Sequence, residues 1–293
     1  MDFCKEKFEG IFPALLTPFD QDDRINKKAL EELVKLNVSK GVKGFYVCGS
    51  TGEAFLLSTE ERKEVMEIVK NAAPEHTLIA HVGSVREKEA MELAKFAKEL
   101  EYSAVSSVAP FYYKYTFDEI KNYYFRLADQ AQLPMIVYNI PALSGVTMGT
   151  KEISTFLRDD RFAGIKFTSN DFFAMEQCKT AFPEKILYNG YDEMMLSGLP
   201  MGADGGIGST YNFMAEKFLR ILELFQQNQM AEARKVQQEA NRIITILCQV
   251  GVMPAEKEVL NQMGVEMGVC RHPFSEPTPE QKELLRREVV QRL

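Results

Sequence analysis

The feature that most constrains the fold of this chain is a regular alternation of short apolar runs with amphipathic helical segments. Short buried strands separated by helices are typical of βα units that build a parallel sheet. Eight such units predict an α/β fold, a (β/α)8 TIM barrel. A doubly wound open sheet is the alternative, although no glycine-rich phosphate turn follows the first run. The runs begin 18 to 33 residues apart, near Ile11, Gly44, Thr77, Ser103, Pro134, Phe162, Lys185 and Ala203.

Helix-start signals support the same alternation. Three segments have the form of a capping box, in which a serine or threonine stands three residues before a glutamate. They begin at Ser58, Ser84 and Thr116. After the eighth apolar run the sequence has helical patterns but no further strand pattern. We therefore predict a barrel catalytic domain over residues 1–225 and a C-terminal helical extension over residues 226–293, packed on the barrel.

Charge and composition disfavour several classes of function. The formal net charge is −7 and the sequence has no basic stripe, so nucleic-acid binding is not expected. No apolar run reaches the ~18 residues that cross a bilayer, so we expect no membrane partner. The N-terminus has no secretory pattern, and the five cysteines show no CxxC spacing. Reduced thiols in a cytoplasmic protein fit this pattern better than a disulfide framework.

The sequence also lacks motifs for a bound cofactor. Its three histidines form no HxH, HExxH or Cys/His cluster, so we expect no bound metal. There is no GxGxxG and no Walker-type loop, which leaves no support for a dinucleotide or ATP enzyme. We expect no cofactor. His81 ends an apolar run, and we interpret it as a hydrogen-bonded histidine at the end of a barrel strand.

Lys166 stands inside the apolar, strand-like run GIKFT, where a charged side chain is costly. If the strand points into a closed sheet, desolvation favours the neutral amine. A neutral amine in a pocket can attack a carbonyl carbon and form a Schiff base. The alternative is a lysine at a strand end that reaches solvent or pairs with a carboxylate. Lys166 taken alone does not distinguish a Schiff-base lysine from a lysine that reaches solvent or pairs with a carboxylate.

Polar residues follow several predicted strands at the barrel end where active sites form. Ser50 and Thr51, within GSTGE, offer hydroxyls and backbone N–H groups to an anion; an ordinary βα turn is the alternative. Tyr138 could relay a proton, or it is a core tyrosine. Asp192 and Glu193 could accept hydrogen bonds from a polyol, or they form a solvated first helical turn.

Together these residues suit a 2-oxo acid. Its carboxylate would lie in GSTGE, its ketone carbon would react with Lys166, and Tyr138 would move protons. Lys166 and Tyr138 come from consecutive predicted strands, and inward-pointing residues of adjacent strands can lie close together.

The motifs GSTGE, YNIP, GIKFT and GADGGIGS resemble, in order and spacing, those of the pyruvate-dependent class I aldolase family. That family includes N-acetylneuraminate lyase and dihydrodipicolinate synthase. The segments YNIPALSGV, LYNGYDE and GADGGIGSTYN are more similar to the lyase branch, and the resemblance extends from ALLTPFD to CRHPF. It implies a (β/α)8 barrel with a C-terminal helical extension and a homotetramer.

The resemblance also implies roles for individual residues. Lys166 would form the Schiff base with pyruvate, Tyr138 would shuttle protons, and Ser50 and Thr51 would hold the carboxylate. Tyr112 matches a position that reaches toward the site of a neighbouring subunit. The positions that match contacts to the sugar-derived part of sialic acid are Thr168, Gly190, Asp192, Glu193 and Ser209.

Leu143 separates the two branches on physical grounds. Dihydrodipicolinate synthases usually carry an arginine at this position, which binds the carboxylate of a second substrate. Leucine cannot pair with a carboxylate, so a neutral polyhydroxylated tail fits better. The segment MPAEKEVL departs from the family by being more acidic. We interpret Glu256 and Glu258 as helix surface, which leaves the far wall of the pocket, and the preference among acyl variants, open.

The sequence thus predicts reversible aldol cleavage of N-acetylneuraminate (sialic acid) to N-acetyl-D-mannosamine and pyruvate through a lysine Schiff base. One alternative is a lyase for another 2-keto-3-deoxy sugar acid, such as 2-keto-3-deoxygluconate. Another is a non-catalytic barrel that binds sialic acid or a 2-oxo acid, although the lysine and the tyrosine are both present. A metal-dependent aldolase is disfavoured by the scarcity of histidine.

Overall fold

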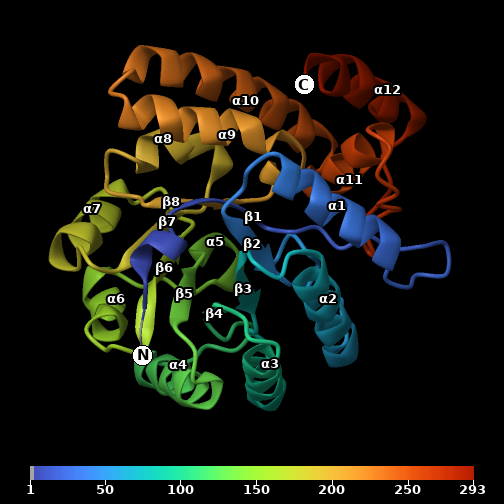
Figure 1. Ribbon diagram of the computed structural model, residues 1–293. Coiled ribbons are helices and arrows are strands. Elements are labelled where there is room, and N and C mark those ends of the chain that lie inside the picture. The colour runs from blue at the N-terminus through green and yellow to red at the C-terminus, as the bar shows by residue number, and fades with distance from the viewer. Residues whose placement is uncertain (1–2) are drawn as a thin grey trace.

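The computed structural model describes residues 3–293, and eight parallel strands form its centre (Figure 1). The strands lie in the order β1-β8-β7-β6-β5-β4-β3-β2, so strands that are neighbours in the sheet are consecutive in the chain, except for the pair β1 and β8. All eight apolar runs are strands, and the predicted TIM barrel is confirmed. The strands are β1 Gly10–Pro13, β2 Gly44–Val47, β3 Thr77–His81, β4 Ala104–Val108, β5 Met135–Asn139, β6 Phe162–Phe167, β7 Ile186–Asn189 and β8 Gly205–Gly208.

Two sets of contacts close the barrel. β1 pairs in parallel with β8, from Gly10 opposite Gly205 to Pro13 opposite Gly208. On its other side β1 runs into a bridge between Ala14 and Tyr46 of β2. A closed parallel sheet leaves no unpaired edge and directs alternate side chains to its interior.

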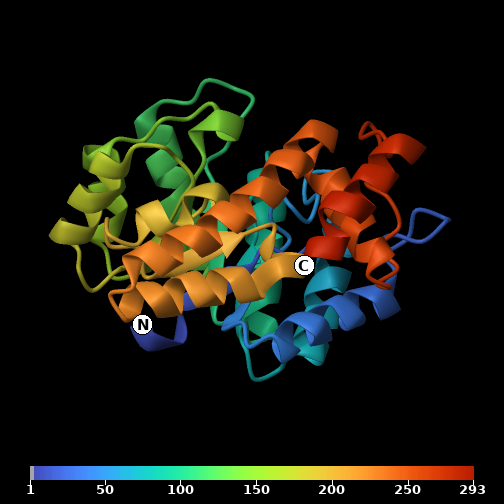
Figure 2. The ribbon, with the colours of Figure 1, turned by 90° about the horizontal axis from the view of Figure 1, so that it is seen from above.

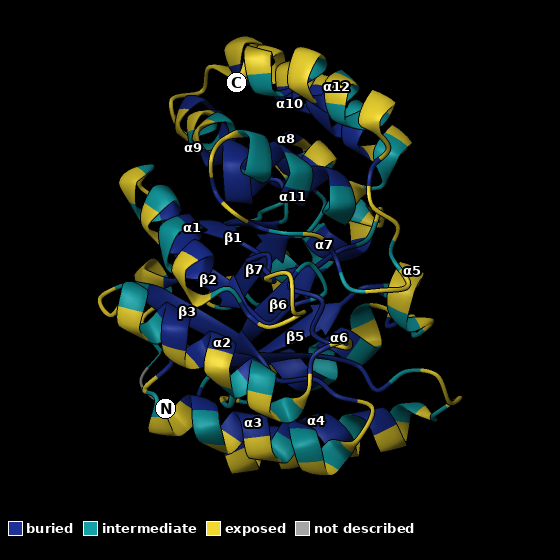
Figure 3. Cartoon of the chain, turned by 90° about the vertical axis from the view of Figure 1, so that its right-hand side faces the viewer, coloured by how far each residue is buried: buried dark blue, intermediate teal, exposed yellow. Residues whose placement is uncertain are grey.

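Helices surround the barrel, and Figure 3 shows buried strands enclosed by helices whose outer faces are exposed. The part of the chain that the structure describes also contains three 3₁₀ turns: η1 Lys5–Lys7, η2 Asp192–Met194 and η3 Val290–Arg292. None of the helices within residues 3–293 is long and apolar enough to cross a membrane. The helices are α1 Lys27–Ser39, α2 Thr59–Ala72, α3 Glu87–Glu99, α4 Phe117–Ala131, α5 Pro141–Ser144, α6 Thr150–Leu157, α7 Phe172–Ala181, α8 Met195–Gly198, α9 Tyr211–Gln226, α10 Met230–Val250, α11 Val252–Gln262 and α12 Pro279–Glu288.

Two of the three predicted capping boxes are confirmed, and one is wrong. Ser58 caps α2 and Thr116 caps α4, each with the reciprocal glutamate contact. The hydroxyl of Ser84 instead accepts from the N–H of Arg86 and donates to Glu89. The hydroxyl is thus used in a local turn, and α3 begins at Glu87 after Arg86, without a side-chain cap.

The core has two layers that follow the period-two alternation of the strands. In β6, Ile165 and Phe167 pack outward against the helices, within the larger apolar cluster. Tyr46 and Tyr138 belong to a separate cluster inside the barrel. Lys166 lies between Ile165 and Phe167 in the strand, so its side chain points into the barrel beside these tyrosines.

The C-terminal helices pack on the barrel rather than extending away from it. α10 packs beside α9, and α11 and α12 pack on each other, on the side of the barrel where α1 lies (Figures 1 and 2). A buried ion pair, 2.6 Å between Lys257 of α11 and Glu53 after β2, links this extension to a βα loop. The boundary between residues 225 and 226 stays a prediction.

Candidate active site

The centre of the candidate site is Lys166, held between two tyrosine rings at the carboxyl end of β6. Tyr138 is the register partner of Lys166 on β5. The Lys166 Nζ lies 4.2 Å from the centroid of the Tyr138 ring and 4.6 Å from that of the Tyr46 ring. All three side chains are at least 96% buried. Lys166 therefore lies against the Tyr138 ring, as expected for inward-pointing residues of adjacent strands.

No acidic side chain neutralises this amine. Within residues 3–293, the Lys166 Nζ forms no ion pair and no hydrogen bond to protein. The interpretation of Lys166 as a lysine that snorkels or pairs with a carboxylate is wrong, because the side chain is buried and unpaired. The neutral form of such an amine is the form that attacks a carbonyl carbon.

Tyr46 is a member of the site that the sequence did not reveal. Its hydroxyl donates to Ser106 Oγ at 3.0 Å, which fixes the ring beneath Lys166. A Cβ at Gly49 would lie 2.7 Å from the same ring, so only glycine lets the next loop approach so closely. Tyr46 stands in the apolar run GFYVCG, where it looks like any core aromatic residue. The period-two alternation was the available signal, because it separates Tyr46 from Phe45 and Val47.

The GSTGE segment forms a tight turn just beyond β2. The Glu53 N–H donates to the Ser50 carbonyl at 3.0 Å, and Glu53 adopts a left-handed φ of 56°. Within the described residues, the N–H groups of Ser50 and Thr51 donate no hydrogen bond. Free N–H groups and hydroxyls in such a turn are a suitable receptor for a carboxylate.

His81 is a hydrogen-bonded histidine at the end of β3, as predicted, and it lies beside the same turn. Its Nε2 accepts from the Val108 N–H at 3.2 Å, so its Nδ1 carries the proton and donates to the Cys48 carbonyl at 2.9 Å. Burial lowers the pKa of His81 well below its usual value, and the nearby Arg62 charge acts in the same direction. His81 is thus a neutral structural residue.

Thr168 and Gly190 lie against one another at the ends of β6 and β7. A Cβ at Gly190 would lie 1.9 Å from the Thr168 Oγ1, so the absence of a side chain makes room for this hydroxyl. The Thr168 Oγ1 is buried and has no hydrogen-bond partner. Buried hydroxyls normally form hydrogen bonds, so the Thr168 hydroxyl is available to form one with a bound ligand.

Asp192 is buried, and its interpretation as part of a solvated helical turn is wrong. Its Oδ2 accepts from the Thr210 N–H at 2.8 Å and from the Thr210 Oγ1 at 2.6 Å. Its Oδ1 has no protein donor within residues 3–293 and lies where a Cβ of Gly208 would be only 1.8 Å away. Burial raises the pKa of Asp192 to about 6, although the Thr210 hydrogen bonds and Lys166 oppose the rise.

Ser209 donates a hydrogen bond to Glu256 Oε1 at 2.7 Å. Glu256 is completely buried, so its interpretation as helix surface is wrong. The error arises because the docking of α11 on the barrel, not the local pattern, decides the environment of this residue. Glu258 is one-eighth exposed and accepts from Gln262 on the same helix at 2.7 Å, so it is not on this wall.

Leu143 and Ser50 line one cavity of about 420 Å³ at the mouth of the barrel. Leu143 is 69% exposed and lies on the short helix α5. The cavity is largely apolar, and Met253 of α11 closes one side of it. The other residues that line it are Glu53, Ala54, Phe55, Leu56, Val108, Phe111, Ile140, Ser144, Pro273 and Phe274.

Tyr112 and Glu193 are two further predicted site residues, and both are exposed. Tyr112 is 84% exposed, has a φ of 78° and contacts only Tyr113 among aromatic rings. Glu193 is exposed, and its backbone carbonyl, rather than its carboxylate, accepts from Asn241 of α10.

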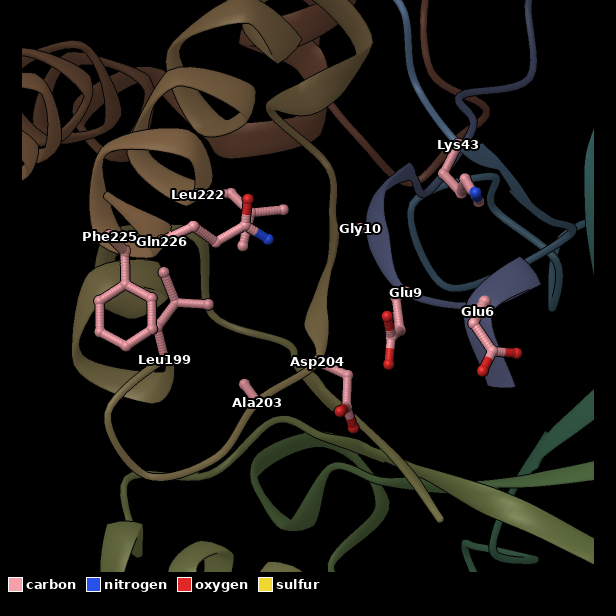
Figure 4. A pocket seen from close by; sticks show the side chains of 10 residues that line it. All are labelled: Glu6, Glu9, Gly10, Lys43, Leu199, Ala203, Asp204, Leu222, Phe225 and Gln226. Atoms are coloured by element: carbon pink, nitrogen blue, oxygen red, sulfur yellow. The ribbon is translucent and has the colours of Figure 1, made fainter. Parts of the chain in front are cut away.

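A second cavity, of about 410 Å³, lies at the opposite end of the barrel (Figure 4). Gly10, which begins β1, and Asp204, which precedes β8, both line it, so it faces the amino ends of the strands. Glu6 and Glu9 make it acidic. Within residues 3–293 no group of three or more histidine, cysteine, aspartate or glutamate side chains could hold a metal ion.

Comparisons with known proteins agree with this geometry. N-acetylneuraminate lyase from Citrobacter koseri is 46% identical over 269 residues, 91% of each chain. A Clostridium difficile structure, CdNal in complex with mannosamine, has a TM-score of 0.95 and 41% identity, covering 97% of this chain and 99% of that one. N-acetylneuraminate lyase from Fusobacterium nucleatum complexed with pyruvate has a TM-score of 0.91 and 38% identity, covering 97% and 98%. The sequence matches the Dihydrodipicolinate synthetase family over residues 7–292, and the chain belongs to that family.

Proposed function

We propose that this protein is an enzyme that cleaves N-acetylneuraminate reversibly to N-acetyl-D-mannosamine and pyruvate. The observation that carries the proposal is the buried, unpaired Lys166 amine beside the Tyr138 ring. Relatives named N-acetylneuraminate lyase, and similar structures that hold mannosamine or pyruvate, identify the two halves of the substrate. Sugar acid and pyruvate are then the small-molecule partners.

The chemistry follows from the arrangement of these groups. Lys166 attacks C2 of the open-chain sugar acid, and loss of water gives an imine whose protonated form withdraws electrons. Tyr138 takes the proton of the C4 hydroxyl as the C3–C4 bond breaks. The resulting enamine is protonated at C3, and hydrolysis releases pyruvate and the free amine. Ser50 and Thr51 hold the substrate carboxylate through their hydroxyls and free N–H groups.

The rest of the substrate would lie along the wall formed by the ends of β6, β7 and β8. Hydroxyl and carboxylate groups are supplied there by Thr168, Asp192 and Ser209. Gly190 has no side chain and so leaves room for the Thr168 hydroxyl. Such groups match a neutral chain of hydroxyls. Glu193 is exposed and would contact only the far end of the chain.

A trapping experiment tests the proposal directly. Borohydride reduction in the presence of pyruvate should leave a stable adduct on Lys166, located by peptide mass mapping. Cleavage of N-acetylneuraminate should be faster than cleavage of 2-keto-3-deoxygluconate and should persist in excess EDTA. An adduct on another lysine would contradict the mechanism, and faster cleavage of 2-keto-3-deoxygluconate would favour the other lyase.

Replacement of Leu143 by arginine should weaken the cleavage of sialic acid. Leu143 lines the apolar mouth, and a guanidinium there would be poorly matched to a neutral polyol. We expect KM for N-acetylneuraminate to rise about tenfold with little loss of Tm, because the position is largely exposed. Steady-state kinetics and thermal unfolding measure both effects. Unchanged kinetics would show that Leu143 is not part of the substrate path, and Leu143→Met is the matched control.

Asp192 should give the reaction an acid limb near pH 6. Because both Thr210 donors occupy Oδ2, the proton taken up below about pH 6 goes to Oδ1. Oδ1 then changes from an acceptor of a substrate hydroxyl into a donor, so kcat/KM should fall as the pH decreases through 6. Asp192→Asn should raise KM and remove this limb from a pH profile between 5 and 8. A wild-type profile that is flat through pH 6 would contradict this role.

We also propose that the protein acts in the cytoplasm as a homotetramer. The exposed Tyr112 supports assembly, since an 84% exposed tyrosine held at a positive φ has no role in the packing of one chain. Light scattering combined with size-exclusion chromatography measures the mass in solution. A mass of one chain at micromolar concentration would contradict the assembly.

A further inference from the structure

The wall that would bind the sugar contains a carboxyl group that the mechanism does not use. Glu256 comes from α11 of the C-terminal extension, and its side chain is completely buried. Its Oε1 accepts the Ser209 hydroxyl at 2.7 Å. Its Oε2 is buried without any hydrogen-bond partner.

This arrangement is unfavourable for folding alone. Burying a carboxyl group is costly unless both oxygens are paired, and here one is not. Burial raises the pKa of Glu256 well above its usual value, and the nearby Asp192 acts in the same direction. A leucine of similar size would fill the space without a polar atom. Groups that reduce stability in this way are concentrated at functional sites.

The position of Glu256 on its helix connects it to the cavity. Met253, three residues earlier on α11, lines the mouth of the barrel together with Ser50. Residues three apart lie on one face of a helix, so α11 presents Met253 and Glu256 to the same side. Ser209 follows β8 directly, at the end of the barrel where Lys166 lies.

We propose that Glu256 is a positioning residue for substrate: by accepting the Ser209 Oγ–H, it turns the lone pairs of that oxygen toward the sugar. A serine hydroxyl has one proton to donate and two lone pairs to accept with. Once the proton is committed to Glu256, Ser209 can only accept. The site then selects a sugar acid that presents a hydroxyl or amide N–H at that point. This inference rests on the proposed function.

Three variants test the acceptor role. Glu256→Leu removes the acceptor, and we expect KM for N-acetylneuraminate to rise roughly tenfold while kcat changes less than about twofold. Glu256→Gln keeps a neutral acceptor oxygen of the same shape and should restore KM to within about twofold of wild type. Ser209→Ala should raise KM as Glu256→Leu does, and the double variant should be no worse than Ser209→Ala alone, because both changes remove one interaction.

Two further measurements separate this role from a structural one. Glu256→Leu should unfold at a temperature equal to or above that of wild type, whereas a structural residue would lose stability and activity together. Trapping of pyruvate by borohydride should be unchanged, because pyruvate does not reach Ser209. Glu258→Leu is the matched control on the same helix and should leave KM unaltered.

The outcomes distinguish the inference from the function on which it rests. A wild-type protein that cleaves no sugar acid would overturn both. A wild type that cleaves N-acetylneuraminate, with KM unchanged in Glu256→Leu, would overturn the role of Glu256 alone. The role of Glu256 would also be overturned if the increase in KM of the Glu256→Leu/Ser209→Ala double variant equalled the product of the two single increases. A Glu256→Gln variant with a KM as high as that of Glu256→Leu would overturn it too.

Discussion

Lys166→Met should abolish sialic-acid cleavage and the trapping of pyruvate while leaving the barrel folded. Methionine keeps the length and the apolar stem of lysine but cannot form an imine. We expect kcat/KM to fall by at least about 10⁴-fold, because the whole covalent route is lost rather than one stabilising contact. Tm should not decrease, since the replaced amine is buried and has no counter-ion. Steady-state kinetics, mass spectrometry after borohydride reduction and thermal unfolding test these three expectations.

Tyr138→Phe provides the control for this experiment. The ring that flanks Lys166 is kept, and only the phenol oxygen is removed. Trapping of pyruvate should persist, whereas cleavage should slow by about 10²-fold to 10⁴-fold, as for loss of a proton-transfer group. A Lys166→Met protein that still cleaves the substrate would refute the Schiff base. A Tyr138→Phe protein with wild-type kcat would assign proton transfer to another group.

Lys257→Met should strongly destabilise the protein although it lies outside the catalytic centre. The ion pair with Glu53 is buried on both sides, and Lys257 also donates to the Val269 carbonyl at 3.0 Å. Removing the cation leaves the Glu53 carboxylate buried with only the Arg271 N–H, 2.8 Å from its Oε2. Breaking a buried pair from one side costs about 3–5 kcal/mol. We expect that loss in the free energy of unfolding, measured by chemical denaturation.

The same change should impair the binding of pyruvate. Glu53 lies two residues beyond Thr51 and holds a left-handed φ, so its ion pair fixes the turn that would bind the carboxylate. We expect the pyruvate concentration needed for half-maximal trapping to rise about tenfold.

The double variant Glu53→Gln/Lys257→Met should recover part of the lost stability, because neither charge is then buried alone. Lys235→Met is the matched control, because Lys235 pairs with Glu232 on an exposed surface and should change stability by less than about 1 kcal/mol. Equal losses in the free energy of unfolding in Lys235→Met and Lys257→Met would show that the buried ion pair contributes no more to stability than an exposed one.

The barrel and its central pair could be predicted from the sequence because both depend on local periodicity. Each strand was visible as an apolar run, and the order of the strands in the barrel is their order in the chain. Lys166 and Tyr138 occupy consecutive strands and the same inward face, so their contact follows from the pleat and the register. The local pattern does not predict the environment of Ser84 correctly, because one hydroxyl can form hydrogen bonds in a turn as well as cap a helix.

The far wall of the site could not be predicted in the same way. Glu256 and Lys257 belong to a helix whose pattern looks amphipathic and solvated, and only its docking on the barrel buries them. Docking depends on contacts between residues far apart in the chain, which carry no periodic signal. Tyr46 could not be predicted either. Every residue of its strand is buried, so no polar residue marks the face that points into the barrel.

The ion pair between Glu53 and Lys257 also joins a turn in the first part of the chain to a helix near its end, which has a consequence during synthesis. The turn that contains Glu53 leaves the ribosome long before α11, and its second anchor, Arg271, lies 218 residues downstream. Until then Glu53 has neither its cation nor this backbone donor. The turn that we propose as the carboxylate receptor is therefore without both anchors until the last part of the chain has been made. A chain released at residue 250 would lack Lys257 and Arg271 and could not fix this turn.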